Sequence, residues 1–115
     1  MTSRKILQAI VSEMVSQLND DILHCGWLCQ IVRLQNPAFT DRKCLDYVVS
    51  AVLLLHREKT IVVGDTLDIE GMVCIQPWPE SNEDLRIRLR SAVFNAEDQD
   101  RSFCFWIQLQ EHFRA

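Results

Sequence analysis

The segment from Thr40 to Trp78 constrains the fold most, because it has the pattern of one helix that leads directly into a β-hairpin. Apolar residues recur there at i, i+3/i+4 and i+7, the spacing of one buried helical face. They are Cys44, Leu45, Val48, Val49, Ala51, Val52 and Leu55. Thr40 or Asp41 can cap the first turn, and His56 and Arg57 complement the carbonyl end. The pattern predicts a helix over 41–57.

Two apolar runs follow this helix and predict a hairpin. The first is Thr60–Gly64, which is too rich in β-branched residues to continue a helix, and the second is Gly71–Ile75. The polar residues 65–70 between them are expected to form the connection, and the Pro-Trp-Pro sequence at 77–79 ends the second strand. A helix followed by such a hairpin is typical of the last half of a winged helix.

The N-terminal part has two helical patterns. A first helix is predicted from Thr2 or Ser3 to about Asn19, and a short second helix over 26–34 ends at Asn36 and Pro37. Between them, Ile22 and Leu23 are expected to form a short extended piece that pairs with the hairpin. The three predicted helices then have helix-turn-helix order.

The segment after Pro79 has two conflicting periodicities. Residues 84–90 (DLRIRLR) alternate as a half-exposed strand would, whereas a longer window keeps helical spacing; we favour the helix. A charged loop is expected over 95–101, and residues 102–109 (SFCFWIQL) predict a central strand that completes the sheet. The predicted fold class is α+β: a winged-helix-like domain with three N-terminal helices, a β-hairpin wing, a further helix and a C-terminal strand in a small antiparallel sheet.

Length and composition favour one compact domain over residues 1–115. The chain has a formal net charge of −4, is 48% hydrophobic, and contains no apolar run long enough to cross a membrane. The five cysteines and the absence of a signal-peptide pattern predict reduced thiols and a cytoplasmic location. The negative charge disfavours nonspecific binding to nucleic acid or an anionic membrane.

Several short motifs resemble those of small bacterial winged-helix-like proteins of unassigned activity. They are the Trp-containing helix entry at Cys25–Val32, IVVGD at Ile61–Asp65, Gly71 with Pro77, Trp78 and Pro79, an Arg-bearing amphipathic helix, and FWIQL at Phe105–Leu109. The resemblance implies the fold and carries no catalytic residue. The residues after Leu109 depart from the pattern, which often finishes with a turn of small residues.

One function class is DNA binding by a transcriptional regulator that uses the helix over 41–57. The DNA-facing candidates are Arg42, Lys43, Tyr47, Ser50 and Arg57. The predicted wing instead carries Asp65, Asp68 and Glu70, which would face the phosphates. The acidic wing and the net charge therefore disfavour DNA. Arg86, Arg88 and Arg90 form the best basic cluster, but we expect them to pair with carboxylates, either Glu80, Glu83 and Asp84 or the loop with Glu97, Asp98 and Asp100.

Metal binding and catalysis find little support. His24, Cys25 and Cys29 could supply ligands from one helical turn, but the second ligand pair of a structural zinc site is missing. There is no nucleophile signature, phosphate loop or metalloprotease motif. We therefore expect no cofactor, no metal site and no enzymatic activity.

The favoured function class is protein interaction or dimerisation. Aromatic and long apolar side chains are enriched at interface centres. The interface candidates are Trp27, Leu54, Trp78 and Phe113. The partner is an unknown protein or a second copy of the chain.

Overall fold

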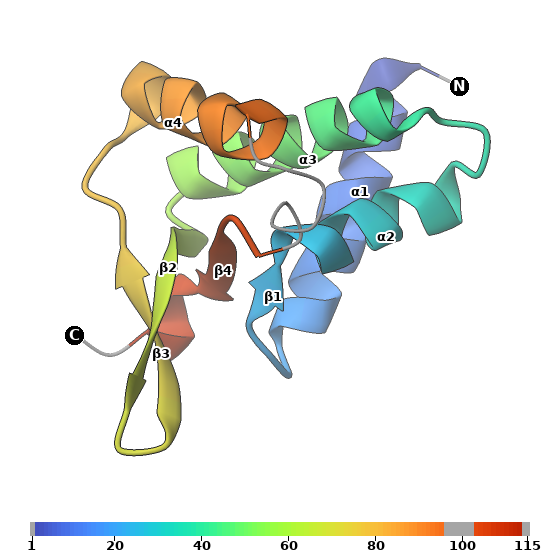
Figure 1. Cartoon of the computed structure of the whole chain (residues 1–115). Coiled ribbons are helices and arrows are strands. Elements are labelled where there is room, and N and C mark those ends of the chain that lie inside the picture. Colours follow the sequence, from blue (N-terminus) through green and yellow to red (C-terminus); the bar gives the residue numbers. More distant parts are fainter. Residues whose placement is uncertain (1, 96–102, 114–115) are drawn as a thin grey trace.

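A computed structural model describes residues 2–95 and 103–113, which form an α+β fold with four α-helices and one four-stranded antiparallel sheet (Figure 1). In chain order the elements are α1 (Ser3–Leu18), β1 (Leu23–His24), α2 (Cys25–Gln35), α3 (Asp41–Arg57), β2 (Ile61–Ile69), β3 (Met72–Pro77), α4 (Asn82–Asn95), β4 (Trp106–Leu109) and the 3-10 turn η1 (Gln110–His112). The α+β prediction is confirmed. None of the helices in the described residues is long and apolar enough to span a membrane.

The helices begin where the sequence supplies caps. The hydroxyl of Thr2 accepts the Lys5 N–H before α1, and Thr40 accepts the Lys43 N–H before α3. Helix α3 is the centre of the fold, since α1, α2, α4 and β2 all pack on it. Its buried residues are those whose spacing predicted the helix, with Leu53 in addition. The predicted helices over 84–90 and over 41–57 are both confirmed.

The sheet has the order β1-β4-β2-β3, so the last strand of the chain lies in its interior. Strand β1 pairs with β4, Leu23 lying opposite Ile107, and β4 pairs with β2 from Ile61 opposite Leu109. The prediction that the piece at Ile22 and Leu23 pairs with the hairpin is therefore wrong. Strand β4 lies between β1 and β2 and pairs with both.

The hairpin is longer than predicted. Strand β2 continues to Ile69, and the connection is only Glu70 and Gly71, which have positive φ angles of 54° and 84°. Residues 65–69, expected to be part of a loop, are strand residues because Leu67 and Ile69 alternate with polar neighbours across from β3. Two consecutive positive φ angles are typical of the type I′ turn that joins tightly paired strands.

The C-terminal strand is shorter than predicted. The expectation was a strand over 102–109, whereas β4 begins at Trp106 and Phe103 is exposed before it. Phe105, Ile107 and Leu109 are buried as the alternation predicted, and β4 is the central strand that was expected. Of the charged loop expected over 95–101, Asn95 ends α4 and the remaining residues lie outside the described part.

Candidate functional site

The strongest candidate site is the outer part of the β2–β3 hairpin, residues 65–76, which we call the arm. Figure 1 shows the hairpin extending away from the helices, and its turn lies beyond any helix of the described chain. The long axis of the molecule is 44 Å, against 29 and 27 Å for the other two. The arm is therefore the part of the fold best placed to reach another molecule.

One face of the arm continues the core-facing side of the sheet. At the base of the hairpin, Ile61 and Val63 belong to the hydrophobic core. Side chains of a strand alternate between its two faces, so Leu67 and Ile69 project to the same side as these core residues. Their partners across the hairpin are Cys74 and Met72. We call these four residues, Leu67, Ile69, Met72 and Cys74, the arm patch.

The arm patch is exposed because the strands extend past the helices. Leu67 is 44% exposed, Ile69 55% and Met72 69%. Eight large apolar side chains are exposed in the described residues, and four of them lie on the arm: these three and Val73 on its other face. An apolar surface concentrated in this way is typical of an interaction site.

The arm carries negative charge without compensating cations. Asp65 and Asp68 lie in β2 and Glu70 is in the turn, while no Lys or Arg occurs between Thr60 and Pro79. The Asp68 carboxylate accepts the Gly71 N–H at 2.9 Å and so helps to hold the turn. The site thus combines an apolar face with an acidic border.

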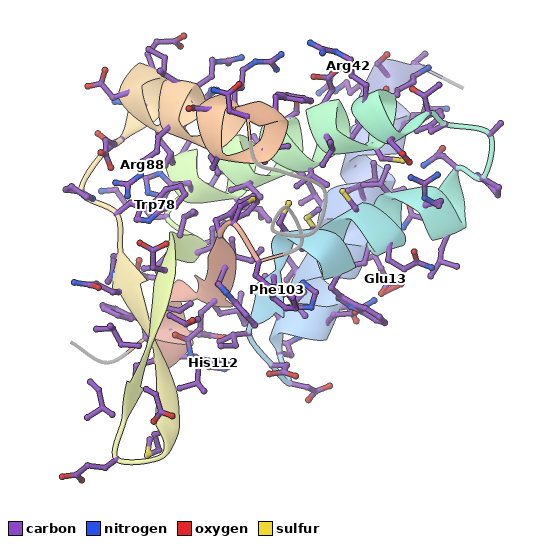
Figure 2. All side chains as sticks on the ribbon, viewed as in Figure 1. Glu13, Arg42, Trp78, Arg88, Phe103 and His112 are labelled. Atoms are coloured by element: carbon purple, nitrogen blue, oxygen red, sulfur yellow. The ribbon has the colours of Figure 1, made fainter. Side chains whose placement is uncertain are left out.

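The base of the arm is anchored by Trp78. Its indole N–H donates to the Asp65 carboxylate at 3.1 Å, and the Arg88 guanidinium lies over its ring, 4.0 Å from the centroid. Figure 2 shows Trp78 and Arg88 side by side under α4. Arg88 also makes a two-oxygen contact with the Glu80 carboxylate at 2.8 and 3.0 Å, and this hydrogen bonding lowers the pKa of Glu80. These contacts hold the base of the arm in place against α4.

The two strands also approach closely at this base. A Cβ atom added to Gly64 would lie 2.0 Å from the carbonyl oxygen of Gln76 on β3. Only glycine fits there without displacing the partner strand.

Four of the five predicted DNA-facing residues share one stripe of α3, on which Tyr47 is half-buried and the other three are exposed. Lys43, Tyr47, Ser50 and Arg57 are separated by helical repeats of four, three and seven residues, with half-buried Leu54 among them. The Lys43 ammonium lies 4.4 Å from the ring centroid of Phe39, and Tyr47 stacks on the same ring. The stripe therefore has two cations, one of them in contact with an aromatic ring.

Arg42 lies to the side of that stripe, toward α4. Its guanidinium is 4.8 Å from the ring centroid of Phe94, which Arg90 also approaches at 4.9 Å. Arg90 in turn pairs with Asp46 at 3.2 Å, and Arg86 pairs with Glu83 at 3.2 Å. The predicted pairing with nearby carboxylates is confirmed for Arg86 and for Arg88, which pairs with Glu80, whereas Arg90 pairs instead with Asp46 of α3.

The four predicted interface residues come from four separate parts of the chain. Trp27 lies exposed at the start of α2, Leu54 is half-buried on α3, and Phe113 is half-buried after η1. Trp78 is only 8% exposed, which makes it an anchor within the fold and not a docking residue.

The residues considered for a zinc site, His24, Cys25 and Cys29, lie at the start of α2. His24 caps α2, because its Nδ1 accepts the Trp27 N–H at 3.2 Å. Hydrogen bonds to the thiols of Cys104 and Cys29, together with burial, raise the pKa of Cys25 and favour its protonated form. Residues 2–95 and 103–113 contain no group of three or more His, Cys, Asp or Glu side chains that could hold a metal ion.

The sequence reasoning missed the arm patch. Its signal was present in TLDIEGMVCI, where Leu67 and Ile69 alternate with acidic residues and Glu-Gly marks a tight turn. The acidic residues were interpreted as a loop. Comparisons with protein-family models, with curated proteins and with solved structures find no match.

Proposed function

We propose that this protein is a non-catalytic interaction module of winged-helix type that docks on another protein through the arm patch. The observation that carries the proposal is the exposure of Leu67, Ile69 and Met72 on a face that continues the core. Completely burying one such side chain contributes about 1.5–3 kcal/mol to association. A partner that covers all three gains part of the free energy that offsets the cost of association.

The winged-helix description is part of this proposal. It is supported by three helices followed directly by the β2–β3 hairpin, in the order expected for such a domain. Helix α4 and strand β4 then extend the pattern, and β4 joins β1 to the hairpin strands. In this description the arm is the wing.

The charge of the arm indicates the chemistry of the partner. Asp65 precedes the patch on the same face of β2, Glu70 lies in the turn and Asp68 projects from the opposite face, and no cation lies between Thr60 and Pro79. A complementary surface has an apolar groove bordered by Lys or Arg side chains. The same charges oppose contact between the wing and phosphates.

Photocrosslinking from the arm tests this proposal. A benzoylphenylalanine is placed at position 69 and, in a matched control, at position 87, because Ile69 and Ile87 are both well exposed on different elements. In cells of the source organism, position 69 is expected to crosslink a different protein that position 87 does not. That protein, once purified, should bind Ile69→Asp at least ~10-fold more weakly than the unchanged chain. Equal crosslinking from both positions, or equal affinity for Ile69→Asp, would contradict the proposal.

DNA binding through α3 is the second candidate, favoured by the stripe that Lys43, Tyr47, Ser50 and Arg57 share. Sedimentation with a random-sequence duplex at low and physiological salt tests it. A salt-sensitive shift that weakens when Lys43 and Arg57 are replaced by Ala would support DNA binding. We expect no shift, because the stripe on α3 offers only two cations and the wing carries three acidic residues.

A further inference from the structure

A second property of the arm concerns its edge and goes beyond the proposed function. Strand β3 is the last strand on one side of the sheet, since the order is β1-β4-β2-β3. One edge of β3 pairs with β2, and the other has no neighbouring strand in the described chain. Such an edge presents backbone donors and acceptors to any strand that can align with it.

The register identifies which groups point outward. The Trp78 N–H donates to the Val63 carbonyl at 2.9 Å, which makes 63 and 78 a hydrogen-bonded pair. Hydrogen-bonded and non-hydrogen-bonded pairs alternate along antiparallel strands, so Val73 and Ile75 belong to non-hydrogen-bonded pairs with β2. Their N–H and C=O groups therefore point to the free edge. No hydrogen bond within residues 2–95 and 103–113 uses these groups.

The edge also lacks the usual protection against pairing. Strand β3 has the sequence MVCIQP, with no charged residue and with its one proline at the end. Natural edge strands usually carry lysines, other inward charges or bulges that prevent pairing with another chain. The absence of these features in β3 favours a partner strand.

We propose that this partner strand is β3 of a second copy, paired antiparallel across a two-fold axis that passes between the two Cys74 residues. In this register Val73 of each copy exchanges both backbone hydrogen bonds with the partner's Ile75. The two four-stranded sheets become one sheet of eight strands. The two arm patches then lie on the same face of that sheet, because the two-fold axis is perpendicular to it.

The side chains fit this register. Val73, which is 56% exposed, gains the partner's Ile75 as its cross-strand neighbour, a β-branched residue that is 5% exposed in its own chain. Cys74 is uncharged and lies opposite its own copy. Glu70 in the turn lies opposite the partner's Trp78, at the end of the seam.

Neighbouring registers are less favourable. An axis at Val73 would need the Gly71 N–H, which already donates to Asp68. An axis at Ile75 would place Val73 opposite Pro77, which has no N–H to donate. Only the axis at Cys74 uses every outward N–H and C=O of Val73 and Ile75.

Sedimentation equilibrium on the full chain tests the dimer. Among the backbone hydrogen-bonding groups, Val73→Pro removes only an outward N–H, whereas the matched control Val73→Thr keeps the N–H and the β-branched shape. The unchanged chain and Val73→Thr should dimerise, and Val73→Pro should have a dissociation constant at least ~10-fold higher. Circular dichroism should show that both variants fold. A chain that stays monomeric up to about 0.5 mM, or equal dimerisation of Val73→Pro, would overturn the proposal.

Oxidation of Cys74 tests the register separately. Non-hydrogen-bonded residues across an antiparallel pair have Cα atoms about 4.5 Å apart, within the range of about 4.4–6.8 Å for disulfides. Treatment with diamide, which takes two electrons and two protons from a pair of thiols and becomes the hydrazine, should link two chains through Cys74. Cys74→Ser should give no linked dimer. Linkage through other cysteines alone would overturn the register.

The dimer and the proposed function can fail independently. The photocrosslinked partner can be titrated against Val73→Pro, which leaves Leu67, Ile69 and Met72 unchanged. Binding by a monomeric Val73→Pro supports the patch as a docking site without the dimer. Conversely, if Ile69→Asp still dimerises but no longer binds the partner, the edge of β3 forms the dimer independently of the patch.

Discussion

The base and the tip of the β2–β3 hairpin belong to the same two strands but have opposite environments. At the base, Trp78 is buried, held by Asp65 and covered by Arg88. At the tip, the Met72 side chain projects to the same side of the hairpin as Trp78, but it is 69% exposed. The change occurs where the helices end and the strands continue.

This difference shows how a sheet can produce a docking surface without any special motif. Val63 and Leu67 project to the same side of β2, yet only Val63 has helices above it. When a strand pair extends beyond the helices, its apolar side chains still alternate, but no helix packs on them. The arm patch is therefore an uncovered continuation of the core, and substitutions at the base and the tip should have unequal effects.

The largest difference is expected between Trp78→Ala and Met72→Ala. Removing the buried indole should lower the free energy of unfolding by about 3–5 kcal/mol, because it leaves a cavity under Arg88. Removing the exposed Met72 side chain should change it by less than about 0.5 kcal/mol. Urea denaturation measures both. A similar loss in the two variants would mean that the tip is as firmly held as the base.

The two glycines of the hairpin sharpen the same comparison. Gly64→Ala at the base should lower the free energy of unfolding by about 2–3 kcal/mol, because the new Cβ would overlap the backbone of β3. Gly71→Ala at the tip has open space around it but a φ of +84°, so it should cost about 1 kcal/mol. Thermal denaturation of the pair provides the measurement. The comparison fails if Gly71→Ala is the more damaging change.

The smallest expected effect is on the acid stability of the base. The Arg88 guanidinium lowers the pKa of Glu80 below its ordinary value of 4.5. A carboxylate with a lowered pKa stabilises the fold above its unfolded-state pKa, and this contribution is lost as the pH falls through the folded-state value. Glu80→Gln should therefore show a smaller loss of stability than the unchanged chain below pH 4.5.

Urea denaturation at about pH 6 and about pH 3 measures this difference. Glu83→Gln is the matched control, since Glu83 pairs with Arg86 but its side chain is 74% exposed. We expect a smaller change for the control because solvent weakens an exposed ion pair. Identical acid dependence of Glu80→Gln and the unchanged chain would show that the pair at the base contributes nothing.

Local patterns in the sequence predicted the helices well. Thr40 caps α3 as expected, and the apolar spacing over 41–57 identified the buried face because α3 is the helix on which the others pack. The helical spacing of Leu85, Leu89, Ala92 and Val93 favours a helix over a strand for α4, and all of these except Ala92 are buried. Such features depend on neighbours a few residues apart.

The pairing of the sheet and the site could not be predicted in the same way. Strand β1 pairs with β4, more than eighty residues later, and no local pattern indicates that partner. Asp65, Asp68 and Glu70 led to the prediction of a loop, although Leu67 and Ile69 alternate between them. The exposure of the arm patch depends on where the helices end, which is a property of the packed fold.

The interior position of β4 has a consequence for how the chain assembles during synthesis. β4 is the last of the four strands to be made, but it lies between β1 and β2. Until Leu109 has left the ribosome, β1 lacks its neighbour and the inner side of β2 stays open. A nascent chain can form its helices and hairpin early. The sheet is completed only when β4 inserts between β1 and β2, which are synthesised before it.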